Sequence, residues 1–69
     1  MKINKRNLGL AIAKSCMTTL EIQKAGKLSS ATIARAKNDP EYVPELLTIG
    51  KLARVLGVSV EYLTEGEQQ

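Results

Sequence analysis

The sequence predicts an all-α fold, and three observations support this prediction. A helix-capping pattern, in which a Ser or Thr is flanked by apolar residues, occurs at Thr18, Ser29 and Ser59. Runs of alternating apolar and polar residues between turns, which indicate β-strands, are missing from the sequence. The chain has no Trp or Phe and only two Tyr, so its core must consist of aliphatic side chains and Met, as in compact helical bundles.

The length of the chain is that of one small domain. Sixty-nine residues lie near the lower limit at which a single hydrophobic core is stable, and they leave little room for a deep pocket. We expect residues 1–64 to form the domain and residues 65–69 to form an acidic flexible tail.

The first helix is expected to begin after Asn4, because Asn is a favoured capping residue, and to end near residue 14 or 15. Small or apolar residues recur at helical spacing on its inner face: Leu8, Ala11, Ile12 and Ser15. The lone cysteine, Cys16, follows in an apolar setting, which predicts a small buried side chain with a structural role.

The second helix, residues 19–25, begins with a predicted capping box. The Thr18 hydroxyl can accept a hydrogen bond from the Glu21 backbone N–H, while the Glu21 carboxylate can accept one from the Thr18 N–H. Met17, before the cap, can pack on Ile22. The start of this helix is therefore well defined by its sequence.

A turn of three or four residues around Gly26 separates the second helix from a third helix, residues 30–37. Ser29 is the expected N-cap of the third helix, with Leu28 and Ile33 as the apolar pair that flanks it. The sequence Asn-Asp-Pro ends this helix. Two helices joined by so short a turn cross steeply, so the second of them projects from the body, an arrangement typical of a helix-turn-helix.

The fourth helix is expected from about residue 44 or 45 to residue 56, followed by Gly57 in a left-handed conformation. Gly50 inside this helix indicates either close approach of another backbone or simple tolerance of a glycine. Ser59 then caps a short fifth helix, residues 60–64. The side chains that the fourth helix is expected to bury are Leu46, Ile49, Leu52, Ala53 and Leu56.

Charge is segregated along the chain. Residues 1–37 contain eight Lys or Arg and one acidic residue, Glu21, which gives a net charge of +7. Residues 38–69 contain two Lys or Arg and six acidic residues, which gives a net charge of −4. A polyanion is attracted to the first part and repelled by the second. The alternative is a solvated surface with an uneven charge distribution.

The composition disfavours several classes of function. The chain has no His, no glycine-rich phosphate loop and no carboxylate cluster outside its acidic second half, so we expect no catalytic residue, metal site or cofactor. No apolar stretch approaches the roughly 20 residues that span a bilayer, and the N-terminal sequence has no signal-peptide pattern. A single cysteine cannot form an internal disulfide, and we expect a cytoplasmic protein.

Two segments resemble a known family. Residues 17–35, with the motif Ser-x-x-Thr-Ile-x-Arg, and residues 44–63, with the motif Leu-Ala-x-x-Leu-Gly-Val-Ser, are similar to the Cro/CI family of phage repressors. This family is also called the XRE or lambda-repressor-like helix-turn-helix family. The similarity extends over residues 8–63. It implies a compact five-helix domain that binds operator DNA sequence-specifically, commonly as a dimer, and regulates transcription.

The turn between the second and third helices departs from the family pattern. Where the family has a glycine, this chain has Lys27, which follows Gly26. Either Lys27 adopts a left-handed conformation at a cost of about 1 kcal/mol, or Gly26 absorbs the turn and the third helix is re-aimed.

The resemblance implies that the third helix enters the major groove of DNA. Arg35 is the main candidate for base contact because its planar guanidinium can bond guanine O6 and N7 together, and an internal salt bridge to Glu41 or Glu45 is the alternative. All positions expected to contact bases are Ser29, Ser30, Ala31, Thr32 and Arg35. Phosphate contacts are expected from Thr18, Thr19, Lys27, Lys37, Asn38, Lys5 and Arg6.

Because the domain is small, we expect a weak homodimer that tightens on DNA, with half-sites about one helical turn, roughly 34 Å, apart. The expected dimer contacts are Val58, Val60, Tyr62 and Leu63. The alternative function is that of a protein-interaction module of the same fold, an antirepressor or antitoxin that binds a partner regulator. Exposed apolar side chains on the second or third helix, such as Leu20, favour this alternative, whereas a mostly basic surface there favours DNA.

Overall fold

The computed structural model describes residues 2–66, and these residues form five α-helices and no strand, which confirms the prediction of an all-α fold. The helix bounds differ from the expected ones by one or two residues at most. None of these helices is both long and apolar enough to cross a bilayer. The helices are α1 (Lys5–Ser15), α2 (Thr19–Gly26), α3 (Ser30–Asn38), α4 (Leu46–Leu56) and α5 (Val60–Thr64).

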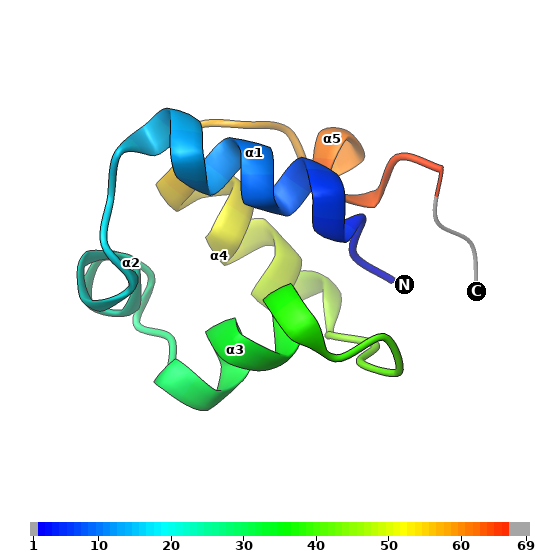
Figure 1. Ribbon diagram of the computed structural model, residues 1–69, viewed down its shortest axis with the longest axis horizontal. Coiled ribbons are helices and arrows are strands. Elements are labelled where there is room, and N and C mark those ends of the chain that lie inside the picture. Colours follow the sequence, from blue (N-terminus) through cyan, green and yellow to red (C-terminus); the bar gives the residue numbers. More distant parts are fainter. Residues whose placement is uncertain (1, 67–69) are drawn as a thin grey trace.

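The helices are arranged so that one face of α3 stays open (Figure 1). In this view α1 lies across the top and α3 across the bottom, with α4 between them. α2 is seen nearly end-on, so it crosses α3 steeply, as the short turn between them predicts. α4 packs against α1, α2 and α5. Among the described residues, no helix covers the lower side of α3.

Side-chain caps begin four of the five helices, as the sequence predicts. At α2 both halves of the capping box are formed: Thr18 Oγ1 accepts from the Glu21 N–H at 3.2 Å, and Glu21 Oε1 accepts from the Thr18 N–H at 2.8 Å. Glu45 precedes α4 without such a bond. The other capping residues, with the distance from the side-chain oxygen to the bonded backbone nitrogen, are Asn4 (3.0 Å), Ser29 (3.1 Å) and Ser59 (3.0 Å).

The core is aliphatic and receives side chains from every helix. Burial of one Leu or Ile side chain stabilises a fold by about 1.5–3 kcal/mol, so these residues supply most of the driving force for folding. Ile3, which precedes the first helix, also belongs to the core although the sequence did not suggest it. The buried apolar residues are Ile3, Leu8, Ala11, Ile22, Ile33, Ala36, Ile49, Leu52, Ala53, Leu56 and Leu63.

Two burial predictions were wrong. Leu46 is 64% exposed in the first turn of α4, whereas Pro44, two residues before the helix begins, is buried. Cys16 is exposed because it is the residue at which α1 ends, in a left-handed conformation with φ 57°, and not part of an inner helix face. A Cβ added at Gly50 would meet nothing within 4 Å, so no other backbone approaches this glycine closely. Of the two alternatives, the helix simply tolerates a glycine at this position.

The start of α1 is joined to the end of α5. Asn4 Nδ2 donates to the Glu65 carbonyl at 2.7 Å, and Asn7 Nδ2 donates to the Tyr62 carbonyl at 2.8 Å. The expected tail therefore begins at Glu65, whose carbonyl is bonded to the N-cap residue of α1. The last three residues of that tail, 67–69, lie outside the described residues.

Candidate nucleic-acid interface

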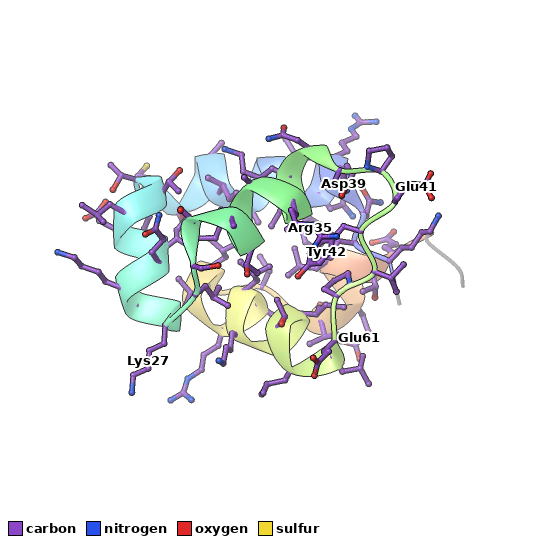
Figure 2. All side chains as sticks on the ribbon, turned by 90° about the horizontal axis from the view of Figure 1, so that it is seen from below. Lys27, Arg35, Asp39, Glu41, Tyr42 and Glu61 are labelled. Atoms are coloured by element: carbon purple, nitrogen blue, oxygen red, sulfur yellow. The ribbon has the colours of Figure 1, made fainter. Side chains whose placement is uncertain are left out.

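The open face of α3 presents small, polar and basic side chains. Figure 2 views the molecule from this side. Ile33 and Ala36 are buried beneath the helix, whereas its exposed residues include no large apolar side chain. Ala34 was not among the expected contacts, although its spacing from Ala31 places it on the same face. The exposed residues of α3 are Ser30, Ala31, Ala34, Arg35, Lys37 and Asn38.

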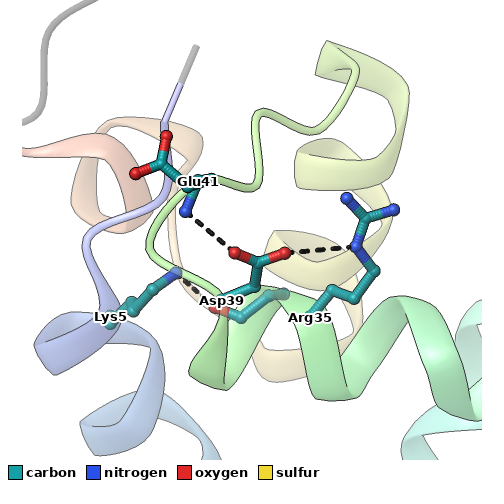
Figure 3. A network of polar contacts seen from close by, with 5 residues as sticks. Lys5, Arg35, Asp39 and Glu41 are labelled. Carbon is teal, nitrogen blue, oxygen red and sulfur yellow. Dashed lines mark hydrogen bonds and ion pairs between the residues drawn. The ribbon is translucent and has the colours of Figure 1, made fainter.

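The guanidinium of Arg35 is held by two neighbours (Figures 2 and 3). Its Nε lies 3.5 Å from Asp39 Oδ2, and its Cζ lies 4.6 Å from the centroid of the Tyr42 ring. The internal salt bridge expected as an alternative is thus formed, but with Asp39 and not with Glu41 or Glu45. Asp39 is one helical turn beyond Arg35, a spacing that brings opposite charges within reach.

Asp39 and Tyr42, the two residues that hold Arg35, are themselves fixed by neighbouring groups. Asp39 Oδ1 accepts a hydrogen bond from the Glu41 backbone N–H at 2.9 Å (Figure 3), and Tyr42 packs against the core. The Arg35 side chain is nevertheless 59% exposed. Within residues 2–66 no hydrogen bond or ion pair engages its two Nη atoms. The outer end of the guanidinium is therefore open to a ligand.

Ser29 and Thr32 take part in the start of α3. Ser29 Oγ accepts from the Thr32 backbone N–H, and the two side-chain oxygens share a hydrogen bond of 2.8 Å. Thr32 is half-buried. Of the five residues expected to contact bases, these two have hydroxyls that are already bonded to each other, whereas Ser30, Ala31 and Arg35 are exposed.

The N-terminus of α2 exposes Thr18 and Thr19, two of the expected phosphate contacts. The Thr18 hydroxyl accepts a bond from the Glu21 N–H and keeps its own O–H as a donor. The Glu21 carboxylate lies at the same helix end and occupies the Thr18 N–H. A phosphate at this end would therefore be bound by hydroxyl groups and would be repelled by Glu21.

The turn between α2 and α3 is made by Lys27, which has φ 54°, so the first of the two alternatives for this turn is correct. Gly26 remains in α2 and is buried. A Cβ at Gly26 would lie 3.0 Å from Leu28 Cδ1 and 3.2 Å from Val55 Cγ2, so this position has little room for a side chain. Lys27 is exposed and points away from the body (Figure 2).

The C-terminal end of α3 has mixed charge. Lys5 Nζ donates to the Ala36 carbonyl at 3.3 Å, so this expected phosphate contact is already bonded to the body of the domain. Arg6, Lys37 and Asn38 are exposed, as a phosphate contact requires. Beyond α3 the loop carries Asp39, Glu41 and Glu45, and this acidic border disfavours a polyanion. Arg6 and Lys37 are therefore freer than Lys5 to contact phosphate.

The expected dimer surface is partly a groove between α1 and α5. Val58 and Tyr62 line it, and Val60 is half-buried. Leu63 is 0% exposed and belongs to the core, so the prediction of a dimer contact there was wrong. Leu10 also lines the groove and is 51% exposed, but it lies on α1, whereas all the predicted dimer contacts lie in or beside α5.

Residues 2–66 contain no group of three or more His, Cys, Asp or Glu side chains that could hold a metal ion. No protein-family model matches the chain, and no match is found among the curated proteins or the solved structures.

Proposed function

We propose that this chain is a sequence-specific double-stranded DNA-binding protein, a cytoplasmic transcriptional regulator of the Cro/CI type that acts by binding and without a cofactor. In this proposal α2 and α3 are the helix-turn-helix, and α3 enters the major groove. The observation that carries the proposal is the open, polar face of α3 from which the supported but exposed guanidinium of Arg35 projects.

Arg35 is the base-reading residue of this proposal. Its Nη atoms can donate together to O6 and N7 of a guanine, a contact that discriminates against other bases by about 1–3 kcal/mol. Nε stays with Asp39, so binding requires no rupture of the internal pair. Ser30 can bond several bases, and Ala31 and Ala34 are small enough to admit a thymine methyl. Because few side chains contact bases, DNA shape supplies part of the specificity.

The charges around α3 orient the duplex. Exposed Lys24 and Lys27 lie on α2 and at the turn before α3, whereas Glu41 and Glu45 lie in the loop after it. A duplex is therefore drawn toward the N-terminal end of α3 and held away from the loop. This docking agrees with the usual geometry, in which N-terminal residues of the recognition helix meet the base edges.

A weak homodimer completes the proposal. The groove between α1 and α5, with Leu10, Val58 and Tyr62, offers an apolar surface for a second copy. Two copies on adjacent half-sites add their contacts, with centres about one helical turn, roughly 34 Å, apart. The operator is then expected to be a short inverted repeat.

Selection of bound sequences from random duplex DNA tests the proposal. We expect Arg35→Ala to relax the preference at one position per half-site, with about 1–3 kcal/mol less discrimination. Lys37→Ala is the matched control: it should weaken binding to all sequences alike and reduce the salt slope by about 1. Equal losses from both changes on every sequence would contradict the base-reading role of Arg35.

A protein-interaction module of the same fold is the second candidate function. Leu20 on α2 is 56% exposed, and the start of α4 exposes Leu46 and Leu47 at 64% and 67%. Such apolar side chains suit a protein partner better than a phosphate backbone. A selection that enriches no duplex sequence even at low ionic strength would favour this candidate over DNA binding.

A further inference from the structure

A groove between the C-terminal end of α2 and the middle of α4 is lined by three cationic side chains. These are Lys27 from the end of α2 and Lys51 and Arg54 from α4. The rest of its lining is Ala25, Gly26 and Val55, so no acidic side chain lines it. The groove has a volume of about 400 Å³. Its charge was missed in the sequence because Lys51 and Arg54 lie in the acidic half of the chain.

Close packing of α2 on α4 forms this groove. Gly26 lies against Val55, and a Cβ at Gly26 would be only 3.2 Å from the Val55 Cγ2 atom, so the two helices approach closely there. The left-handed conformation of Lys27, with φ 54°, ends α2 at this point. Lys51 and Arg54 are three residues apart on α4, a spacing that puts their side chains on neighbouring positions of one helix face.

The three cations have no anionic partner among the described residues. The structure contains one salt bridge in residues 2–66, between Arg35 and Asp39, and it does not involve the groove. Three like charges around one concave surface repel one another, and a bound anion relieves this repulsion. The groove is open to solvent, so a phosphate group can reach its cations. Lys27 lies two residues before Ser29, the N-cap of α3.

We propose that the groove binds the phosphate backbone of the same duplex that α3 enters, with Lys51 and Arg54 as additional phosphate contacts beside Lys27. This inference rests on the proposed function, and it extends the interface from α3 over the end of α2 to α4. The contacts are independent of sequence, so they add affinity and salt dependence without changing base preference.

Single variants Lys51→Ala and Arg54→Ala test the inference. The matched control is Lys2→Ala, which removes the same charge from the segment before α1, outside this groove and outside the groove between α1 and α5. Binding of a duplex from the selection is measured by fluorescence anisotropy at several salt concentrations. We expect each groove variant to reduce the salt slope by about 0.9 and the control to leave it unchanged. Base preference should be the same in all three, and circular dichroism verifies the fold.

The outcomes separate this inference from the function on which it rests. If wild-type protein binds the duplex and the two groove variants match Lys2→Ala, the groove is not a backbone site, while DNA binding stands. If wild-type protein binds no duplex at low ionic strength, both proposals fall. Inorganic tripolyphosphate is the second probe: strong binding that needs Lys51 and Arg54, with an unchanged duplex salt slope, would assign the groove to a free polyphosphate and overturn the duplex proposal.

Discussion

The guanidinium of Arg35 lies over the ring of Tyr42, with Cζ 4.6 Å from the ring centroid, while Asp39 holds its Nε edge at 3.5 Å. Asp39 directly follows α3, and Tyr42 lies in the loop after it. Together these two residues restrict the long side chain of Arg35, whose outer end is exposed. Restriction before binding lowers the conformational entropy that is lost on binding, an effect of about 0.5–1.5 kcal/mol for a flexible side chain.

Tyr42→Leu tests the aromatic support. An exposed cation–π contact contributes about 0.5–1 kcal/mol, so its removal should lower the preference for the base read by Arg35 about two- to fivefold. Tyr42→Phe keeps the ring face and should retain the preference. The measurement is the ratio of affinities for the selected duplex and for one with that base pair replaced. Wild-type ratios in both variants would show that the ring does not position Arg35.

Asp39→Asn tests the charged support. The variant keeps an oxygen that can accept from the Glu41 N–H but loses the charge beside Arg35. We expect tighter binding to all duplexes because one repulsive charge is removed, together with a weaker base preference because Arg35 is less well held. Glu41→Gln removes the same charge from the same loop without touching Arg35, so it should tighten binding and leave the preference unchanged. Identical behaviour of the two variants would assign Asp39 a purely electrostatic effect.

Local features of this fold were predictable from the sequence, and features that depend on packing were not. The Thr18 and Glu21 capping box joins residues three apart, so their spacing alone defines it. The partner of Arg35 was misassigned because α3 extends to Asn38, which brings Asp39 one turn from Arg35. The exposure of Leu46 is likewise a property of where a helix meets the core, which periodicity does not reveal.

The residues of the candidate site also divide into those that the sequence predicts and those that depend on packing. Arg35 and Ser30 are exposed on α3 as helical spacing predicts. The groove cations Lys51 and Arg54 could not be assigned, because segregation of charge along a chain is not segregation in space once α4 packs against α2. The burial of Leu63 was equally hidden in the sequence, since a short helix gives too few residues to define an inner face.

Asn4 has two separable contributions to stability. Its side-chain oxygen caps α1, a role worth about 1 kcal/mol, and its Nδ2 donates to the Glu65 carbonyl, a bond that also contributes about 1 kcal/mol. Asn4→Ala should therefore lower the free energy of unfolding by about 2 kcal/mol, and Asn4→Ser, which keeps a capping oxygen, by about half as much. Urea unfolding followed by circular dichroism measures both. Equal losses in the two variants would mean that only the bond to Glu65 matters.

Leu10 tests the proposed dimer surface. Leu10→Gln removes apolar surface from the groove between α1 and α5, so we expect a folded protein with weaker self-association and weaker, less cooperative operator binding. Leu20→Gln is the control, because Leu20 is similarly exposed on α2 and lies outside that groove. Sedimentation measures the oligomeric state with and without DNA. A wild-type protein that is strictly monomeric in both conditions would contradict the dimer.

Within residues 2–66, two residues other than glycine have left-handed conformations, and they allow backbone strain to be separated from ligand binding. Cys16 ends α1 with φ 57°, and Lys27 ends α2 with φ 54°. Replacement of either by Gly removes strain of about 1 kcal/mol, so each variant should unfold at a melting temperature about 4–8 °C higher. The two variants should differ in DNA binding, because only Lys27→Gly removes a charge from the groove, which reduces the salt slope by about 0.9. If Lys27→Gly were stabilised but bound DNA with an unchanged slope, Lys27 would be a turn residue without a phosphate contact.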